Sequence, residues 1–269
     1  MAKITDISKI VECNRLAWDA SAIEHRENRN WEHLRTGFSD PKFSTFDSTI
    51  TKVLNELPIK GQSVVQIGCN NGRELLSAMS LGASAGFGID QSGNFLEQAK
   101  ELALISGRDC EYVRANVYDL PQTVPKNFDI ALITIGVLNW MPDLSTFFNV
   151  VASLLHSSGK LVIYETHPFL EMFEPGATDP YSVNSSYFSD EPDVSEQTIV
   201  YDDGEPSEAP ASYWFTHRLG KIINACIQAG LVIDSVDEYP HSNRETEYDL
   251  YTHQTAQIPM CFTLTAHKK

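Results

Sequence analysis

Polar side chains that could contact a nucleoside follow the first two strands expected in the chain. Residues 63–72 read SVVQIGCNNG, which is typical of a short buried strand and a tight turn, and Arg73 begins a helical pattern. Asp90 ends the next expected strand, about 20 residues beyond Gly68, the spacing at which a carboxylate accepts from ribose hydroxyls. A strand, a turn and a helix N-terminus at one edge of a parallel sheet form a ligand site. The segment therefore predicts a nucleoside site.

The glycine spacing in this turn argues against a diphosphate ligand. Dinucleotide sites use Gly-x-Gly-x-x-Gly, but Asn70 takes the second glycine position and Arg73 the third. A phosphate loop would need Gly-Lys-Ser or Gly-Lys-Thr, and the sequence contains neither. A nucleoside without phosphates fits best. The alternative is an ordinary strand, turn and helix with no ligand.

The stretch resembles motif I of the class I S-adenosylmethionine-dependent methyltransferases. This resemblance implies S-adenosylmethionine as the cofactor and S-adenosylhomocysteine as its product. The family usually has an acidic residue where Gln66 stands and often a glycine where Asn70 stands. These departures leave open a non-catalytic S-adenosylmethionine-binding module. The implied cofactor contacts in this part of the chain are Gly68, Cys69, Asn70, Gly72, Asp90 and Gln91.

The segment after the third expected strand resembles the adenine motif of the same family. Here the amide oxygen of Asn116 would accept from the adenine amine, and the N–H of Val117 would serve a ring nitrogen. The alternative is that Asn116 is only a turn residue. After the fourth strand, the resemblance places Ile135 and Gly136 at the methionine end of the cofactor. The Trp140 face could attract the sulfonium, or Trp140 could be a hydrophobic plug.

The run 136–168 resembles a subgroup of small-molecule methyltransferases, of the type 11/12 kind, with Glu-x-His-Pro after the fifth strand. His167 is the first candidate for a general base and His217 the second, because an imidazole titrates near neutral pH. Arg218 would orient an anionic group of the substrate or pair with Glu165. No metal site is expected. The implied substrate contacts are Trp18, His25, Asn139, Trp140, Glu165, Tyr213 and Arg218.

Strand and helix patterns alternate between residues 63 and 167, which indicates an α/β fold with a doubly wound, mostly parallel sheet. The resemblance implies seven strands in a Rossmann-like methyltransferase fold. We expect an N-terminal helical cap (1–60), a cofactor-binding core (61–167), a lid inserted after the fifth strand (168–215) and the C-terminal part of the core (216–269). The expected helices are 7–25, 46–57, 73–79, 92–107, 143–155 and 219–230, and the expected strands are 63–67, 85–89, 110–114, 128–135, 159–165, 231–236 and 260–266.

The expected lid has an unusual composition. Residues 161–217 contain no Lys or Arg but many aromatic residues, prolines and acids. A long irregular segment of this kind is usually a lid or a binding loop. We expect it to be ordered, with its acidic part, 190–208, the most mobile. The first helix either packs on the core or forms a flap over the cofactor.

The net charge and the cysteine content limit the classes of substrate and the cellular compartment that we expect. The 269 residues include 20 Lys or Arg and 36 Asp or Glu, a formal charge of −16, which disfavours a nucleic-acid substrate. Five scattered cysteines without CxxC spacing favour a reducing cytoplasm. No apolar run is long enough for a membrane span, and residues 1–7 do not read as a secretory signal. We expect a cytoplasmic monomer or homodimer that acts on a small molecule.

The function that these features favour is methyl transfer from S-adenosylmethionine to an O, N or C nucleophile of a small organic molecule. A nicotinamide-dependent oxidoreductase on a similar sheet stays open, although the absent third glycine disfavours it. A non-catalytic binding module also stays open. A serine hydrolase is disfavoured because the sequence has no Gly-x-Ser-x-Gly.

Overall fold

The computed structural model describes residues 6–200 and 205–269. A seven-stranded sheet with the order β3-β2-β1-β4-β5-β9-β8 forms its centre. Only β9 runs against its neighbours β5 and β8, so the sheet is mostly parallel, as predicted. All seven expected strands are present. They are β1 (Ser63–Ile67), β2 (Ala85–Asp90), β3 (Cys110–Arg114), β4 (Phe128–Thr134), β5 (Leu155–Thr166), β8 (Leu231–Tyr239) and β9 (Cys261–Lys268).

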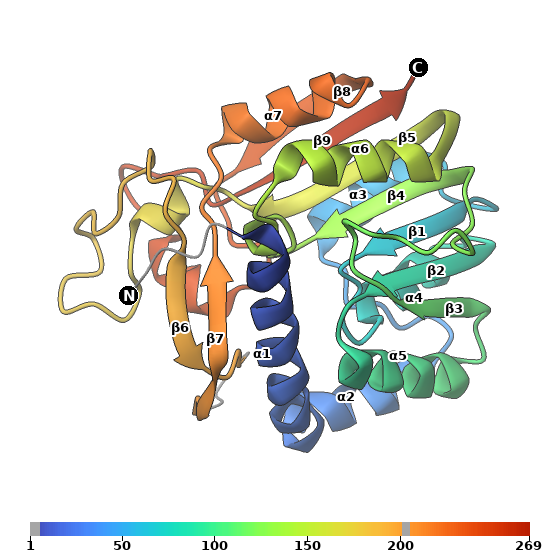
Figure 1. Cartoon of the computed structure of the whole chain (residues 1–269), viewed down its shortest axis with the longest axis horizontal. Coiled ribbons are helices and arrows are strands. Elements are labelled where there is room, and N and C mark those ends of the chain that lie inside the picture. The colour runs from blue at the N-terminus through green and yellow to red at the C-terminus, as the bar shows by residue number, and fades with distance from the viewer. Residues whose placement is uncertain (1–5, 201–204) are drawn as a thin grey trace.

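Helices cover both faces of the sheet, which explains why β4 is almost entirely apolar. Because side chains alternate along a strand, Val64 packs in one core with α3 and α4, whereas Val65 packs in the other with α6 and α7. Figure 1 shows these two helical layers. The helices are α1 (Ile7–Glu27), α2 (Arg29–Phe38), α3 (Ser48–Glu56), α4 (Arg73–Ser80), α5 (Gly93–Ser106), α6 (Leu144–Leu154) and α7 (Leu219–Gln228).

The N-terminal cap contains three helices, of which the sequence reasoning found two. The helix that it missed is α2, which the side chain of Asn28 caps by accepting from the N–H of Trp31. Trp31, Leu34 and Phe38 are buried against α5, and their spacing of three and four residues was the available signal. Within the described ranges, no helix is both long and apolar enough to cross a membrane.

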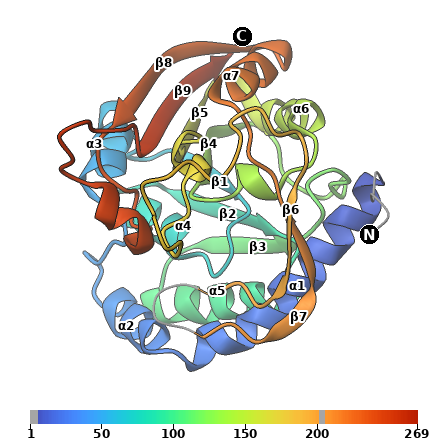
Figure 2. The same ribbon diagram turned by 90° about the vertical axis from the view of Figure 1, so that its left-hand side faces the viewer.

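The insertion after β5 is more regular than predicted. It contains an antiparallel hairpin of β6 (Asp193–Gln197) and β7 (Glu208–Trp214), followed by α7. Residues 201–204 of the predicted acidic stretch lie outside the described residues. The hairpin lies along α1 in both views (Figures 1 and 2), so both elements stand in front of the carboxyl ends of the parallel strands.

Polar side chains of α1 bind the backbone of the insertion. The Asn14 side chain accepts from the N–H of Tyr213 at 2.7 Å and donates to its carbonyl oxygen at 3.1 Å. Ser21 Oγ accepts from the N–H of Ile199, and His25 Nε2 lies 2.8 Å from the carbonyl oxygen of Ile199. Asn14, Ser21 and His25 are buried. Side chains of α1 therefore form the hydrogen bonds that a neighbouring β-strand would otherwise form with these backbone groups.

Replacing Asn14 by alanine should lower the free energy of unfolding by roughly 1–3 kcal/mol, because it leaves the N–H of Tyr213 buried without a partner. Chemical denaturation measures the loss, and hydrogen exchange at Tyr213 should accelerate. The control is Ile23→Ala, since Ile23 is on the same helix and is 61% exposed. Equal stability of the two variants would contradict a structural role for Asn14.

Candidate functional site

The turn between β1 and α4 requires glycine at two positions. Gly68 has φ +66°, and a Cβ there would lie 2.8 Å from a methyl carbon of Val137. Gly72 has φ +75°, and a Cβ there would lie 2.6 Å from the hydroxyl of Tyr112. Both positions are in the left-handed region, which glycine adopts without steric cost. The turn is therefore held close to β3 and to the segment that follows β4.

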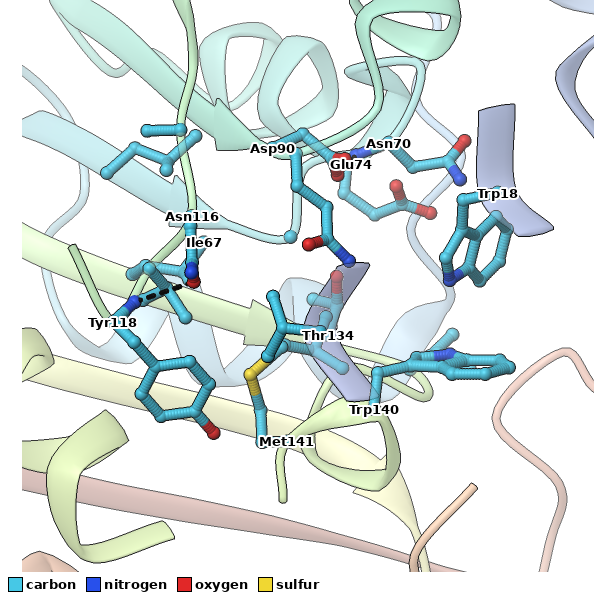
Figure 3. A pocket seen from close by; sticks show the side chains of 18 of the residues that line it. Trp18, Ile67, Asn70, Glu74, Asp90, Asn116, Tyr118, Thr134, Trp140 and Met141 are labelled. Atoms are coloured by element: carbon cyan, nitrogen blue, oxygen red, sulfur yellow. Dashed lines mark hydrogen bonds between the residues drawn. The ribbon is translucent and has the colours of Figure 1, made fainter. Parts of the chain in front are cut away.

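A pocket lies in front of this turn, at the carboxyl ends of β1, β2 and β4 (Figure 3). It has about 950 Å³ of empty space, including the part open to solvent. Asn116 and Tyr118 are at one end, Trp18 and Trp140 are at the other, and Asp90 lies between them. The pocket brings together nine residues predicted from the sequence: Gly68, Asn70, Asp90, Gln91, Asn116, Val117, Ile135, Trp18 and Trp140.

The Asp90 carboxylate occupies the middle of the pocket. One of its oxygens accepts from the N–H of Asn70 and the other from the N–H of Ser92, both at 2.8 Å. Desolvation raises the pKa of Asp90, and these N–H groups oppose that shift. Since each carboxylate oxygen has two lone pairs, both can accept one further hydrogen bond. This is the arrangement that a pair of ribose hydroxyls needs.

Helix α1 also reaches the loop that follows Asp90. The carboxylate of Asp19 accepts from the hydroxyl of Ser92 at 2.7 Å, and its carbonyl oxygen accepts from the side chain of Asn94 at 2.9 Å. Trp18, the preceding residue, lines the pocket. The sequence left open whether this helix packs on the core or forms a flap over the cofactor. In the structure it packs on the core and also lines the pocket.

At one end of the pocket, Asn116 takes part in a turn as well as in the pocket wall. Its side-chain oxygen accepts from the N–H of Tyr118 at 3.0 Å (Figure 3). The Tyr118 hydroxyl bonds to the backbone of Asp143. The turn interpretation of Asn116 is therefore correct, and the remaining lone pair of its amide oxygen could still accept from an adenine amine.

Towards the other end lies an ion triad that the sequence reasoning did not find. Arg73 Nε donates to Glu74 Oε1 at 2.9 Å, and an Nη of Arg244 donates to the same oxygen at 3.1 Å. Burial opposes ionisation of Glu74, but the two guanidinium groups outweigh it and lower its pKa. An ionised carboxylate and a guanidinium group thus line the same end of the pocket.

The tryptophans at this end contact one another edge to face. The rings of Trp18 and Trp140 have centroids 5.2 Å apart, and those of Trp140 and Trp214 are 5.0 Å apart. Trp214 Nε1 donates to the carboxylate of Glu171 at 2.9 Å. Trp140 therefore lines the pocket as predicted while it also packs between two other tryptophans.

Neither histidine predicted as a general base lines this pocket. His167 is buried, with Nε2 2.8 Å from a carboxylate oxygen of Glu238, and its Nδ1 accepts from the N–H of Phe169. His217 Nε2 lies 2.8 Å from the carbonyl oxygen of Met141. Burial lowers the pKa of both rings, that of His217 to about 4. The structure thus gives both histidines structural partners, and neither is retained as a base.

Other predicted site residues also have structural roles outside the pocket lining. The carboxylate of Glu165 accepts from the N–H groups of Gly136 and Leu138. The side chain of Asn139 donates to the carbonyl oxygen of Phe215, and Arg218 pairs with Asp190. The predicted residues that do not line the pocket are Cys69, Gly72, Gly136, His25, Asn139, Glu165, His167, Tyr213, His217 and Arg218.

Comparison with known proteins agrees with this geometry. Residues 65–163 match a family model described as a methyltransferase domain. This segment, which runs from β1 into β5, is therefore similar to a methyltransferase domain. An S-adenosylmethionine-dependent methyltransferase from Mesorhizobium loti has a similar structure, with a TM-score of 0.56 and 20% identity over 81% of this chain and 96% of that one.

Two curated methyltransferases are each similar to part of this chain. A ribosomal protein L11 methyltransferase from Tolumonas auensis is 27% identical over 129 residues, which are 48% of this chain and 41% of that protein. A ubiquinone biosynthesis O-methyltransferase from Neisseria meningitidis is 29% identical over 109 residues, 40% of this chain and 45% of that protein. The matches span less than half the length of these relatives, and the two names indicate different substrates.

Proposed function

We propose that the protein transfers a methyl group from S-adenosylmethionine to an O, N or C nucleophile of a small organic molecule. The observation that carries the proposal is the order of groups along one pocket. Asp90 can accept from ribose hydroxyls, while Arg73 and Glu74 offer opposite charges farther along. These charges match the α-carboxylate and α-ammonium groups of a bound amino-acid moiety.

The residues present fit this cofactor despite the departures noted in the sequence. Gln66 replaces the usual acidic residue, but Glu74 supplies a carboxylate to the same pocket. When bound, S-adenosylmethionine supplies an electrophilic methyl group on a sulfonium. The task of the protein is then to orient the acceptor, which can contribute roughly 7–11 kcal/mol. Trp18 and Trp140 could also stabilise the positive charge with their ring faces.

A nicotinamide dinucleotide fits the pocket less well. Its diphosphate would have to approach the turn where Arg73 replaces the third glycine. The ionised Glu74 also lies in this pocket, and juxtaposing like charges costs several kcal/mol. We therefore favour the methyltransferase over the oxidoreductase.

Titration calorimetry with S-adenosylmethionine, adenosine and NAD tests the proposal. We expect S-adenosylmethionine to bind and NAD not to bind at the same concentrations. Glu74→Gln should lower the affinity for S-adenosylmethionine roughly tenfold. It should leave the affinity for adenosine unchanged, because adenosine lacks the methionine moiety. Asp119→Asn, an exposed acid outside the pocket, is the control. Tighter binding of NAD than of S-adenosylmethionine would overturn the assignment.

A further inference from the structure

A second cavity adjoins the cofactor pocket. It has about 1070 Å³ of empty space, including the part open to solvent. Three residues, Arg73, Ile135 and Glu245, line both spaces. The remaining walls come from α2, from residues 43–45, from Val200 and from the turn at 244–247. Figure 2 shows α2 and the segment that contains η3 (Thr246–Tyr251) on the same side of the strand ends.

The charges on the cavity wall are not balanced. Of the lining residues, Arg73 and Arg244 are cationic, and both donate to the single carboxylate of Glu74. The other Nη of Arg244 donates to the carbonyl oxygen of Thr45 at 2.8 Å. Two further carboxylates, Glu245 and Glu247, line the cavity itself. Among the described residues, the lining itself carries two carboxylates and two guanidinium groups. Glu74, which accepts from both guanidinium groups, adds a third carboxylate beside the cavity.

Acidic residues beyond the lining add to this excess. The pKa of Glu171 is raised to about 7. Burial is the main cause, the hydrogen bond from Trp214 opposes the shift, and the carboxylates of Glu245, Asp193 and Glu247 add to it. The pKa of Glu247 is raised by its burial and then by Glu174. Like charges therefore already oppose one another here, and an added cation would relieve this repulsion. An added anion would increase it.

The cavity also offers apolar surface. Leu34, Phe43, Ile135 and Val200 line it together with the charged residues. The backbone of Arg244 has φ +78°, a left-handed conformation that is uncommon for residues other than glycine. This turn presents both the Arg244 guanidinium and the Glu245 carboxylate to the cavity. An apolar body with one cationic group would match these walls.

We propose that this second cavity binds the methyl acceptor and that the acceptor is a small molecule carrying an amino group. This inference rests on the proposed function, since it takes the neighbouring pocket as the cofactor site. The amine would be held by Glu245 and Glu247, with Glu245 placed where the two spaces meet. The sequence predicts instead that Arg218 orients an anionic group of the substrate or pairs with Glu165. In the structure Arg218 pairs with Asp190, outside this cavity.

The test uses benzylamine and benzoate, a cation and an anion built on the same ring. Titration calorimetry in the presence of S-adenosylhomocysteine should show benzylamine binding roughly tenfold tighter than benzoate. Glu247→Gln should lower the affinity for benzylamine severalfold without lowering the affinity for S-adenosylhomocysteine, because Glu247 lines the second cavity and not the first. Glu245→Gln should weaken benzylamine at least as much.

The control is Asp190→Asn, which also removes one negative charge but at a site that is 70% exposed and pairs with Arg218. It should leave benzylamine binding unchanged. Benzoate binding as tightly as benzylamine, no benzylamine binding, or equal losses in Asp190→Asn and Glu247→Gln would each overturn the inference. Because S-adenosylmethionine binding is measured separately, a protein that binds the cofactor but fails these tests refutes this inference alone.

Discussion

Replacing Asp90 by alanine is expected to weaken the binding of S-adenosylmethionine by roughly 1.5–3 kcal/mol, the value of hydrogen bonds to a charged group. The variant removes the proposed ribose acceptor. It also releases the N–H groups of Asn70 and Ser92, which the carboxylate now binds. Calorimetry should therefore show a loss of roughly 10- to 150-fold in affinity.

Asp90→Ala should lower the affinity for adenosine as much as the affinity for S-adenosylmethionine, because both ligands contain the ribose. This separates Asp90 from Glu74, whose replacement should affect only the ligand with a methionine moiety. Asp119→Asn again serves as the control. If the Asp90 variant keeps its fold and binds adenosine normally, Asp90 is not the ribose acceptor.

Replacing Glu165 by alanine is expected to lower the free energy of unfolding by roughly 2–6 kcal/mol, because two backbone N–H groups lose their partner and each costs about 1–3 kcal/mol. Those groups belong to Gly136 and Leu138, in the turn after β4. Ile135 and Val137 from the same turn line the proposed cofactor pocket. Cofactor affinity should therefore fall along with stability.

The contribution of Glu165 should also depend on pH. Burial raises the pKa of Glu165 to about 8, although the two N–H groups act in the opposite direction. Its folded-state pKa is thus above its unfolded value of about 4.3, so the folded state binds more protons between these values. The contribution of Glu165 to the free energy of unfolding is therefore fully present below about pH 4.3 and is lost as the pH rises towards 8.

Denaturation at pH 5.5 and pH 8.5 compares the wild type with Glu165→Gln, which cannot titrate. The stability of the wild type relative to this variant should decrease from the lower to the higher pH. Glu171, whose pKa is also raised, is present in both proteins, but its charge raises the pKa of Glu165. The difference therefore reports the titration of Glu165 together with this interaction. A difference that increases with pH would show that the carboxylate form of Glu165 is preferred in the folded state.

The parts of the site that local sequence determines were predictable. Gly68, Asn70 and Asp90 lie at the ends of strands whose apolar pattern and spacing identify them, so their position at one sheet edge follows from the fold. Asn116 and Ile135 follow the third and fourth strands, and the resemblance to the methyltransferase family predicted them as cofactor contacts. Both line the pocket.

The roles of the charged residues were less predictable because they depend on contacts between distant segments. Arg244 meets Glu74 across 170 residues of sequence, and nothing near either residue indicates the pair. The Glu-x-His-Pro segment was correctly placed at the end of β5, but Glu165 is directed to the turn after β4 and His167 to Glu238. Side-chain direction at a strand end depends on these partners and cannot be read from the pattern alone.

The pairing of α1 with the hairpin also bears on how the chain folds during synthesis. Asn14 and its partner Tyr213 are separated by 199 residues. A ribosome that adds roughly 5–20 residues per second needs roughly 10–40 s to cover that distance. Throughout that interval the buried face of α1 lacks the strand that it holds in the finished protein. Helix α1 therefore emerges before the hairpin yet reaches its final packing only after the hairpin has been made, and in the meantime it is a candidate for binding by chaperones.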